Sequence, residues 1–253
     1  MTLVIDCGNT RTRVARLGTV GWMGMASFPS TRPGVTAFLA PLLARLLMGM
    51  PTDTARPMIG LSCVVPDLAE PITAIAQEVG EVVPARPASN NDLAICYQPQ
   101  ESLGPDRLAN SIAAYARYGG PCIIVDVGTA LTVDALSGAG EFLGGVIFPG
   151  PAAAEAALLQ STTAVQPGSR PTAELIGSST AAGIQAGTAY GYPALIDGLV
   201  DRFQARLGGG AAVVLTGGGV WVLAEWPRRT VYDPYLTLRG LAMVARQGLE
   251  SCG

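Results

Sequence analysis

The chain has 253 residues, of which 49% are hydrophobic, so it is long enough for one large or two small domains with an ample core. Its net charge is −3 and its pI is near 5.0. Nucleic acids and membrane surfaces bind a basic face of a protein, so this charge argues against both as partners. Only 14% of the residues are charged, against about 25% in typical soluble domains, and we therefore expect some apolar surface to be covered in a homo-oligomer.

The first half of the chain predicts three strands followed by alternating helices and strands. The opening strand, residues 2–5, is apolar, and residues 12–17 alternate as a returning strand. Leucines at helical spacing predict a helix over residues 36–48, with Pro41 in its first turns or at a kink. The remaining predicted elements are a third strand over 21–28, a strand over 57–64, a helix over 67–79 and a short strand over 81–83.

The second half repeats this order of three strands, helix, strand, helix, strand. Its strands are expected near residues 121–126, 131–136, 141–148, 211–215 and 230–232, with a closing helix after them. A helical insertion is expected over residues 151–207. The pattern predicts an α/β protein made of two duplicated ribonuclease-H-like domains with mixed sheets, divided as residues 1–118 and 119–253.

Each half contains an acidic, glycine-containing turn directly after its first buried strand. The turns read Asp6-Cys7-Gly8-Asn9-Thr10 and Asp126-Val127-Gly128-Thr129-Ala130. Asp, Asn and Gly also suit ordinary hairpin turns, which is the structural alternative. Two copies at equivalent positions favour a repeated ligand site, because glycine lets the backbone approach a ligand and threonine adds a hydroxyl.

Residue types that are absent restrict the chemistry. The chain has no histidine and no lysine, so all 16 basic residues are arginine. This excludes a Ser-His-Asp triad, a histidine metal site, a Schiff-base lysine and the lysine of a Walker A loop. A proton acceptor must be Asp, Glu, Cys or Tyr, and phosphates must be held by backbone N–H groups, hydroxyls, arginine and a metal ion.

The stretch Gly104-Pro105-Asp106-Arg107 begins an amphipathic helix and has two interpretations. Proline at the first helical turn followed by aspartate satisfies ordinary helix-start preferences. Alternatively, Asp106 accepts a proton from an alcohol and Arg107 binds an anionic group. The spacing alone leaves both open.

Two further glycine clusters follow predicted strands. Residues 143–151 contain closely spaced glycines that suit either a plain turn or close backbone approach to a ligand or partner chain. Thr216-Gly217-Gly218-Gly219 lies between a buried strand and a short helix, where adenosine or phosphate can lie against the backbone.

No membrane span or signal peptide is expected. Pro41 and Arg45 interrupt the most apolar region, and no basic residue precedes Asp6. The five cysteines are odd in number and lack a C-x-x-C pair, which fits reduced thiols. We therefore expect a cytoplasmic protein.

Taken together, the motifs resemble the type III pantothenate kinases, a family of the acetate and sugar kinase, Hsp70 and actin superfamily (the actin-like ATPase superfamily). They occur in family order over nearly the whole chain. The resemblance is carried by Asp6-x-Gly8-Asn9-Thr10, Tyr97-x-Pro99 with Gly104-x-Asp106-Arg107, Asp126-x-Gly128-Thr129-Ala130, Gly144-Gly145-x-Ile147-x-Pro149-Gly150, Ser179-Thr180, Thr216-Gly217-Gly218 and Leu238-Arg239-Gly240-Leu241.

The resemblance implies ATP-dependent phosphorylation of pantothenate, the first step of coenzyme A synthesis, by a homodimer that uses Mg²⁺ and a monovalent cation, K⁺ or NH₄⁺. It implies Asp106 as the catalytic base and Asp126 as the ligand of the monovalent cation. Many family members carry lysine where this chain has Arg13, which changes the reach and geometry of that contact. The implied ATP-binding residues are Asp6, Gly8, Asn9, Thr10, Arg13, Thr129, Gly217 and Gly218, and the implied pantothenate-binding residues are Tyr97, Gly104, Pro105, Asp106, Arg107 and Thr180.

Two other functions share the predicted fold. One is a kinase of another small alcohol, because fold does not determine substrate. The other is a non-catalytic regulator that keeps the nucleotide-binding fold, although the acidic residues at positions 106 and 126 favour an enzyme.

Overall fold

The computed structural model describes residues 2–18, 21–48, 56–89, 93–161, 174–223, 226, 228 and 230–251. The chain forms two compact units: unit 1 is Met1–Arg117 with Tyr235–Gly253, and unit 2 is Tyr118–Pro234. The predicted domain boundary, between residues 118 and 119, lies one residue from the observed boundary between Arg117 and Tyr118. Residues 235–253, which the sequence pattern places in the second domain, lie in unit 1.

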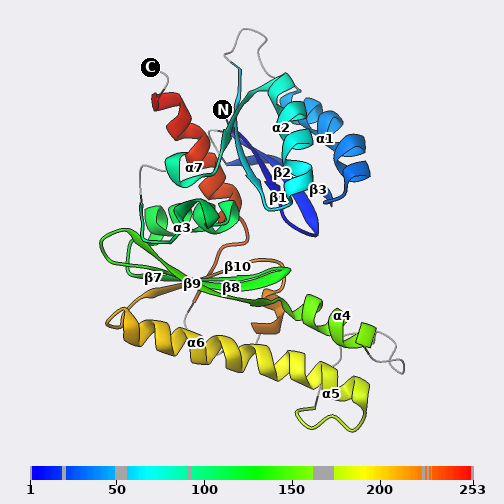
Figure 1. The fold of residues 1–253 in the computed structure, drawn as a ribbon, viewed down its shortest axis with the longest axis vertical. Coiled ribbons are helices and arrows are strands. Elements are labelled where there is room, and N and C mark those ends of the chain that lie inside the picture. Colours follow the sequence, from blue (N-terminus) through cyan, green and yellow to red (C-terminus); the bar gives the residue numbers. More distant parts are fainter. Residues whose placement is uncertain are drawn as a thin grey trace. The chain divides into compact units, whose positions relative to one another are not determined.

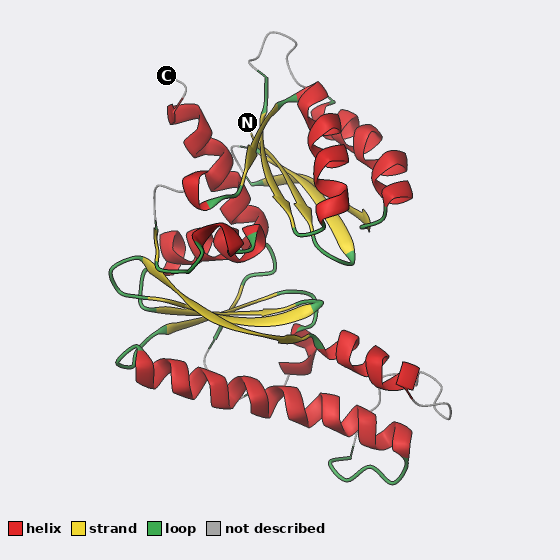
Figure 2. Ribbon diagram, viewed as in Figure 1, coloured by secondary structure: helices red, strands yellow, loops and turns green. Residues whose placement is uncertain are grey.

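Unit 1 contains a mixed sheet with the strand order β3-β2-β1-β4-β5 (Figures 1 and 2). Strand β1 pairs antiparallel with β2 and parallel with β4, so β1 lies at the centre of the sheet. The strands of this sheet are β1 (Thr2–Cys7), β2 (Arg11–Leu17), β3 (Trp22–Pro29), β4 (Met58–Cys63) and β5 (Glu81–Pro84). The short strand β6 (Ala94–Ile95) follows in the chain and is not part of this sheet.

Helices cover both faces of this sheet. Helices α1 (Arg32–Leu47) and α2 (Pro66–Val79) lie side by side on one face, as Figure 1 shows, and enclose a core that includes Leu3, Ile5 and Leu39. Helix α7 (Leu236–Ser251) packs against β1 and β4. Because successive side chains of a strand point to opposite faces, alternate residues of β1 face the two helical layers. The other helical segments are η1 (Pro87–Ser89), η2 (Gln100–Ser102) and α3 (Pro105–Tyr118).

Unit 2 repeats the sheet of unit 1. Its strands occur in the order β11-β10-β7-β8-β9, in which β7 pairs antiparallel with β8 and parallel with β10. This order and these directions match those of β5-β4-β1-β2-β3, which confirms the duplicated mixed sheets predicted from the sequence. The strands are β7 (Cys122–Val127), β8 (Ala130–Leu136), β9 (Glu141–Pro149), β10 (Ala212–Thr216) and β11 (Val231–Tyr232).

The expected insertion of unit 2 contains helices between β9 and β10, and its residues 162–173 lie outside the described part of the chain. Helix α6 runs along the sheet in Figure 2 and packs Ile196 and Val200 against the strands β7 and β8. The helical segments of unit 2 are α4 (Pro151–Ser161), α5 (Thr180–Ala186), the π-helical η3 (Gly187–Gly191), α6 (Tyr192–Arg206) and η4 (Val220–Leu223).

Helix α1 differs from its prediction. It begins at Arg32 instead of residue 36, because the Thr31 side chain accepts a hydrogen bond from the backbone N–H of Gly34 and Pro33 occupies the first turn. Pro41 therefore lies inside the helix and not in its first turns. Among the described residues, no helix combines the length and apolar character needed to cross a membrane.

Candidate functional site

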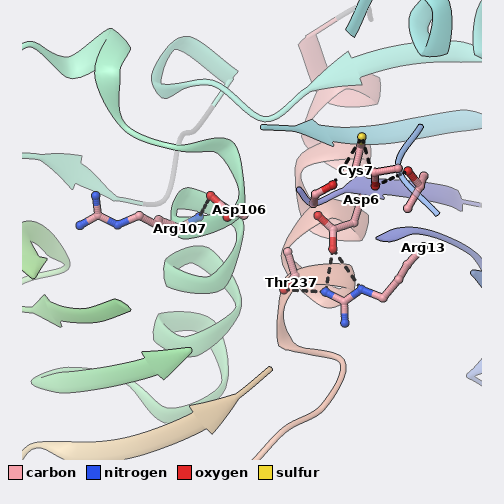
Figure 3. Close-up of polar contacts among 9 residues, drawn as sticks. Asp6, Cys7, Arg13, Asp106, Arg107 and Thr237 are labelled. Carbon is pink, nitrogen blue, oxygen red and sulfur yellow. Dashed lines mark hydrogen bonds and ion pairs between the residues drawn. The ribbon is translucent and has the colours of Figure 1, made fainter. Parts of the chain in front are cut away.

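The first acidic turn holds a buried carboxylate paired with arginine. Asp6 and Arg13 lie opposite each other on β1 and β2, and Arg13 Nη2 lies 2.6 Å from Asp6 Oδ2. Arg13 Nη2 also donates to Thr237 Oγ1 at 3.3 Å, which ties the pair to α7 (Figure 3). In this structure the guanidinium of Arg13 is thus engaged by Asp6 and Thr237, while Gly8, Asn9 and Thr10 form the turn beyond them.

Helix α7 packs closely on its neighbours at two glycines. A Cβ atom added at Gly60 of β4 would lie 2.1 Å from the carbonyl oxygen of Leu241, and one added at Gly240 would lie 1.8 Å from the carbonyl oxygen of Ala109 in α3. Both positions require glycine because the obstacle is backbone. The Leu238-Arg239-Gly240-Leu241 motif therefore fixes the position of α3 relative to the central strands of unit 1.

Asp106 lies in the first turn of α3 and is largely removed from solvent. Its Oδ1 accepts the backbone N–H of Arg107 at 2.8 Å, and Gly104 leaves room for this carboxylate, since a Cβ there would lie 2.7 Å from Oδ1. Burial raises the pKa of Asp106, the hydrogen bond from Arg107 opposes that shift, and the charge of Asp6 adds to it. A carboxyl group with a raised pKa in a helix start is suited to accept a proton.

Arg107 follows Asp106, but its side chain points away from it (Figure 3). The residue is buried, with 6% of its surface exposed. Its guanidinium carbon lies 5.3 Å from the centre of the Tyr97 ring, and Nη1 lies 3.4 Å from the Tyr97 hydroxyl. Stacking on an aromatic ring orients the planar guanidinium, which favours bidentate recognition of a carboxylate.

The second acidic turn lies in unit 2 between β7 and β8. The Gly128 N–H donates to the carbonyl of Ala130 at 2.9 Å, and Thr129 lies exposed at the tip. Gly150, at the end of the glycine cluster after β9, donates its N–H to Thr129 O at 2.8 Å, and a Cβ there would lie 2.0 Å from Gly128 O. This cluster is thus more than a plain turn, because it supports the acidic loop.

The loop after β10 folds against the same acidic turn. The Gly219 N–H donates to Val127 O at 2.7 Å. Gly217 has φ +93°, and a Cβ added there would lie 2.5 Å from both Asp126 Oδ1 and Val127 O. A carboxylate oxygen and a carbonyl oxygen therefore lie directly against Gly217, so only glycine lets this loop pack on the second acidic turn. The described residues contain no group of three or more His, Cys, Asp or Glu suited to one metal ion.

The expected site residues divide between the units. Unit 1 brings together the first acidic turn with Asp6 and Arg13, and it also contains Tyr97 and residues 104–107. Unit 2 brings Asp126 and Thr129 together with the Gly217 loop and also contains Thr180, which is exposed at the start of α5. Sequence reasoning missed Thr237, because its contact with Arg13 joins residues more than two hundred positions apart and has no local sequence signal.

The duplicated sheets and their acidic turns define an actin-like ATPase fold. Solved structures with this fold include the activator of 2-hydroxyisocaproyl-CoA dehydratase from Clostridium difficile with bound ADPNP. Its TM-score is 0.57 at 12% identity over 99% of this chain and 96% of that one. MreB 5 of Spiroplasma citri bound to AMPPNP gives a TM-score of 0.52 at 11% identity, covering 99% and 97%.

The sequence comparisons identify the family. The type III pantothenate kinase family model matches residues 2–202. A type III pantothenate kinase of Nocardia farcinica is 35% identical over 96% of both chains. That of Roseiflexus castenholzii is 39% identical over 73% of this chain and 74% of the relative. The chain belongs to the type III pantothenate kinase family, which confirms the resemblance seen in its motifs.

Proposed function

We propose that this protein transfers the terminal phosphoryl group of ATP to the hydroxyl of pantothenate, which yields 4'-phosphopantothenate and begins coenzyme A synthesis. Membership of the family supports this activity over a regulator or a kinase of another alcohol. The observation that carries it is the start of α3, where a carboxyl group with a raised pKa precedes an arginine stacked on tyrosine. This pairing supplies a proton acceptor and a carboxylate-binding group on one helix turn.

Asp106 acts as the catalytic base. It accepts the proton of the pantothenate hydroxyl as the phosphoryl group is transferred, and its raised pKa improves it as an acceptor. Phosphoryl transfer depends mainly on positioning and charge stabilisation, so a single base contributes modestly. Arg107, held by Tyr97, binds the carboxylate of pantothenate, and Gly104 and Pro105 shape the helix start. Thr180 is a further residue proposed to bind pantothenate.

The nucleotide is bound as its magnesium complex. The residues proposed to bind ATP are Asp6, Gly8, Asn9, Thr10, Arg13, Thr129, Gly217 and Gly218. Both structural relatives reported above hold adenine nucleotide analogues, which supports ATP as the ligand. With no lysine in the chain, backbone N–H groups and arginine carry this recognition.

Asp126 holds a monovalent cation, K⁺ or NH₄⁺. Its carboxylate lies at the end of β7, beside the turn that carries Thr129, and oxygen is the ligand that such a cation prefers, which supports this assignment. When bound, the cation supplies positive charge near the phosphates. Rates that are equal in sodium-only and potassium buffers would contradict the assignment, whereas Asp126→Asn is expected to weaken ATP use.

The active form is a homodimer located in the cytoplasm. Large apolar side chains are exposed on both units, including Met23 at 63% in unit 1 and Ile147 at 57% and Ile176 at 84% in unit 2, which supports association. We assign the partner surface to unit 2. Sedimentation at micromolar concentration should show a dimer that Ile176→Glu weakens and that Met48→Glu, an exposed apolar position of unit 1, leaves intact. A fully active monomer would contradict the dimer. Five cysteines without a disulfide pattern support the reducing compartment.

The proposed activity is tested by a panel assay. ADP release is measured with pantothenate and with other small alcohols, each with and without potassium. Pantothenate should stimulate ADP release above every other alcohol. Stimulation by a different alcohol would indicate a kinase of another specificity, and ATP binding without turnover on any acceptor would indicate a regulator.

A further inference from the structure

Two cysteines end neighbouring strands beside the first acidic turn. Cys7 is the last residue of β1 and Cys63 the last residue of β4, and the two are register partners in the parallel pair. The Val64 N–H donates to the carbonyl of Cys7 at 3.0 Å, which fixes the strands at this point. Adjacent strands lie about 4.8 Å apart, and this spacing falls within the Cα separation of about 4.4–6.8 Å that a disulfide spans.

The two sulfur atoms lie on the same face of the sheet. Cys7 belongs to the core under α1 and α2, and Cys63 packs against that core. The Cys63 thiol donates to the carbonyl of Val65 at 3.2 Å, and the Cys7 thiol donates to the Ser30 hydroxyl at 3.9 Å. The side-chain contact between Cys7 and Cys63 is the main reason that the pKa of Cys7 is lowered, to about 6, and the same contact raises the pKa of Cys63.

Only one of the pair can be reached from outside. Cys7 is fully buried, whereas Cys63 is half-buried and lines a cavity of about 840 Å³ in unit 1. Polar side chains from Thr73, Gln77 and Gln100 also line this cavity. A small polar oxidant can therefore reach the sulfur of Cys63 through this cavity, whereas the sulfur of Cys7 is buried.

We propose that a hydroperoxide oxidises Cys7 and Cys63 to an intramolecular disulfide that disables the adjacent phosphate loop. The Cys63 sulfur attacks one oxygen of the peroxide and the O–O bond breaks. The departing oxygen takes up the thiol proton and leaves as an alcohol or water, so that Cys63 becomes a sulfenic acid. The Cys7 sulfur, after loss of its proton, then attacks the sulfenic sulfur. The S–S bond forms, water leaves, and two electrons have passed from the thiols to the peroxide.

The consequence for the site follows from the contacts of the Cys7 thiol. Its sulfur donates to the carbonyl of Gly8 and to the hydroxyl of Ser30, each at 3.9 Å, and the Gly8 N–H donates to Arg11 O at 3.2 Å to close the turn. A disulfide removes the S–H of Cys7, so the turn that carries Gly8 loses this donor. This step rests on the proposed function, which assigns ATP phosphates to that turn.

The test treats the reduced full-length protein with hydrogen peroxide and reads three properties. Peptide mapping should show a Cys7–Cys63 cross-link, and the intact mass should fall by two hydrogen atoms. Binding of ATP, measured by calorimetry, should weaken at least about tenfold, the size of one lost hydrogen bond to a charged phosphate. Dithiothreitol should restore it.

Two variants serve as controls. Cys63→Ser should bind ATP as the untreated protein does and lose all sensitivity to peroxide, whereas Cys96→Ser, which removes an exposed cysteine elsewhere, should remain sensitive. Oxidation to isolated sulfinic acids without a cross-link would overturn the thiol-pair chemistry. A complete cross-link with unchanged ATP binding would overturn its effect on the loop. The mapping needs no turnover, so it remains informative if pantothenate is not the acceptor.

Discussion

Asp106→Asn separates the catalytic role of Asp106 from a helix-start role. Asparagine keeps the shape and retains an oxygen that can accept the Arg107 N–H, which lies 2.8 Å from Asp106 Oδ1 in the native protein. It removes only the basicity. We expect kcat to fall by about 10²–10⁴-fold, because a positioned base contributes about that much, which corresponds to about 2.7–5.4 kcal/mol in activation free energy.

The stability of Asp106→Asn should stay the same or rise, although its kcat falls. Burial raises the pKa of Asp106 in the folded protein, so the ionised form is penalised by folding. In the native protein, the raised pKa of Asp106 contributes to the free energy of unfolding only while the carboxyl group is protonated. This contribution is fully present below the ordinary carboxyl pKa of about 3.9, and it is lost as the pH rises through the raised pKa of the folded protein. Asp106→Asn should therefore melt at or above the native temperature at neutral pH, with a difference that shrinks as the pH is lowered.

The chain offers a matched control in Asp67. It follows Pro66 in the first turn of α2, as Asp106 follows Pro105 in α3, but it is exposed. Asp67→Asn should leave kcat unchanged and cost at most about 1 kcal/mol of stability. Steady-state kinetics with pantothenate and thermal melts between pH 4 and 8 measure both variants. A destabilised Asp106→Asn protein with native kcat would reduce Asp106 to a helix-start residue and refute the reasoning.

Three further substitutions test the supporting structure. Gly217→Ala should lower the free energy of unfolding by about 2–4 kcal/mol in chemical denaturation and raise the KM for ATP. The reason is that Gly217 has a positive φ and that the Cβ of alanine would press on Asp126. A native KM would contradict the assignment of this loop to ATP binding. Gly240→Ala should cost about 1–3 kcal/mol or more, since its Cβ would meet Ala109 backbone at 1.8 Å, and an unchanged melting temperature would show that α7 and α3 pack otherwise. Arg107→Lys should raise the KM for pantothenate more than it lowers kcat, because lysine lacks the bidentate fork; equal effects on both would argue against carboxylate binding.

Much of the fold follows from local sequence. The apolar runs before Asp6 and Asp126, with returning strands after them, predicted the two duplicated sheets, and the structure confirms their order. The start of α1 was predicted four residues late, although Thr31 and Pro33 are ordinary signals of a helix start. The leucine periodicity begins after the capped first turn, so it does not mark where the helix starts.

Features that depend on contacts between distant segments were not predictable. The sequence around α7 carries no signal that the helix belongs to unit 1. Its place in unit 1 depends on the close backbone approach at Gly60 and Gly240, which joins distant segments. The pairing of Cys7 with Cys63 depends on the parallel register of β1 and β4 and is invisible in the cysteine spacing. The roles of the site residues remain predictions, whereas the family that suggested them is confirmed.

The most direct test is product identification. The purified protein is incubated with ATP, magnesium, potassium and pantothenate, and the products are identified by mass spectrometry and phosphorus NMR, with Asp106→Asn alongside. We predict that ADP and 4'-phosphopantothenate form in equal amounts with the native protein and far more slowly with the variant. Formation of ADP without phosphorylated pantothenate, or equal product from both proteins, would contradict the account.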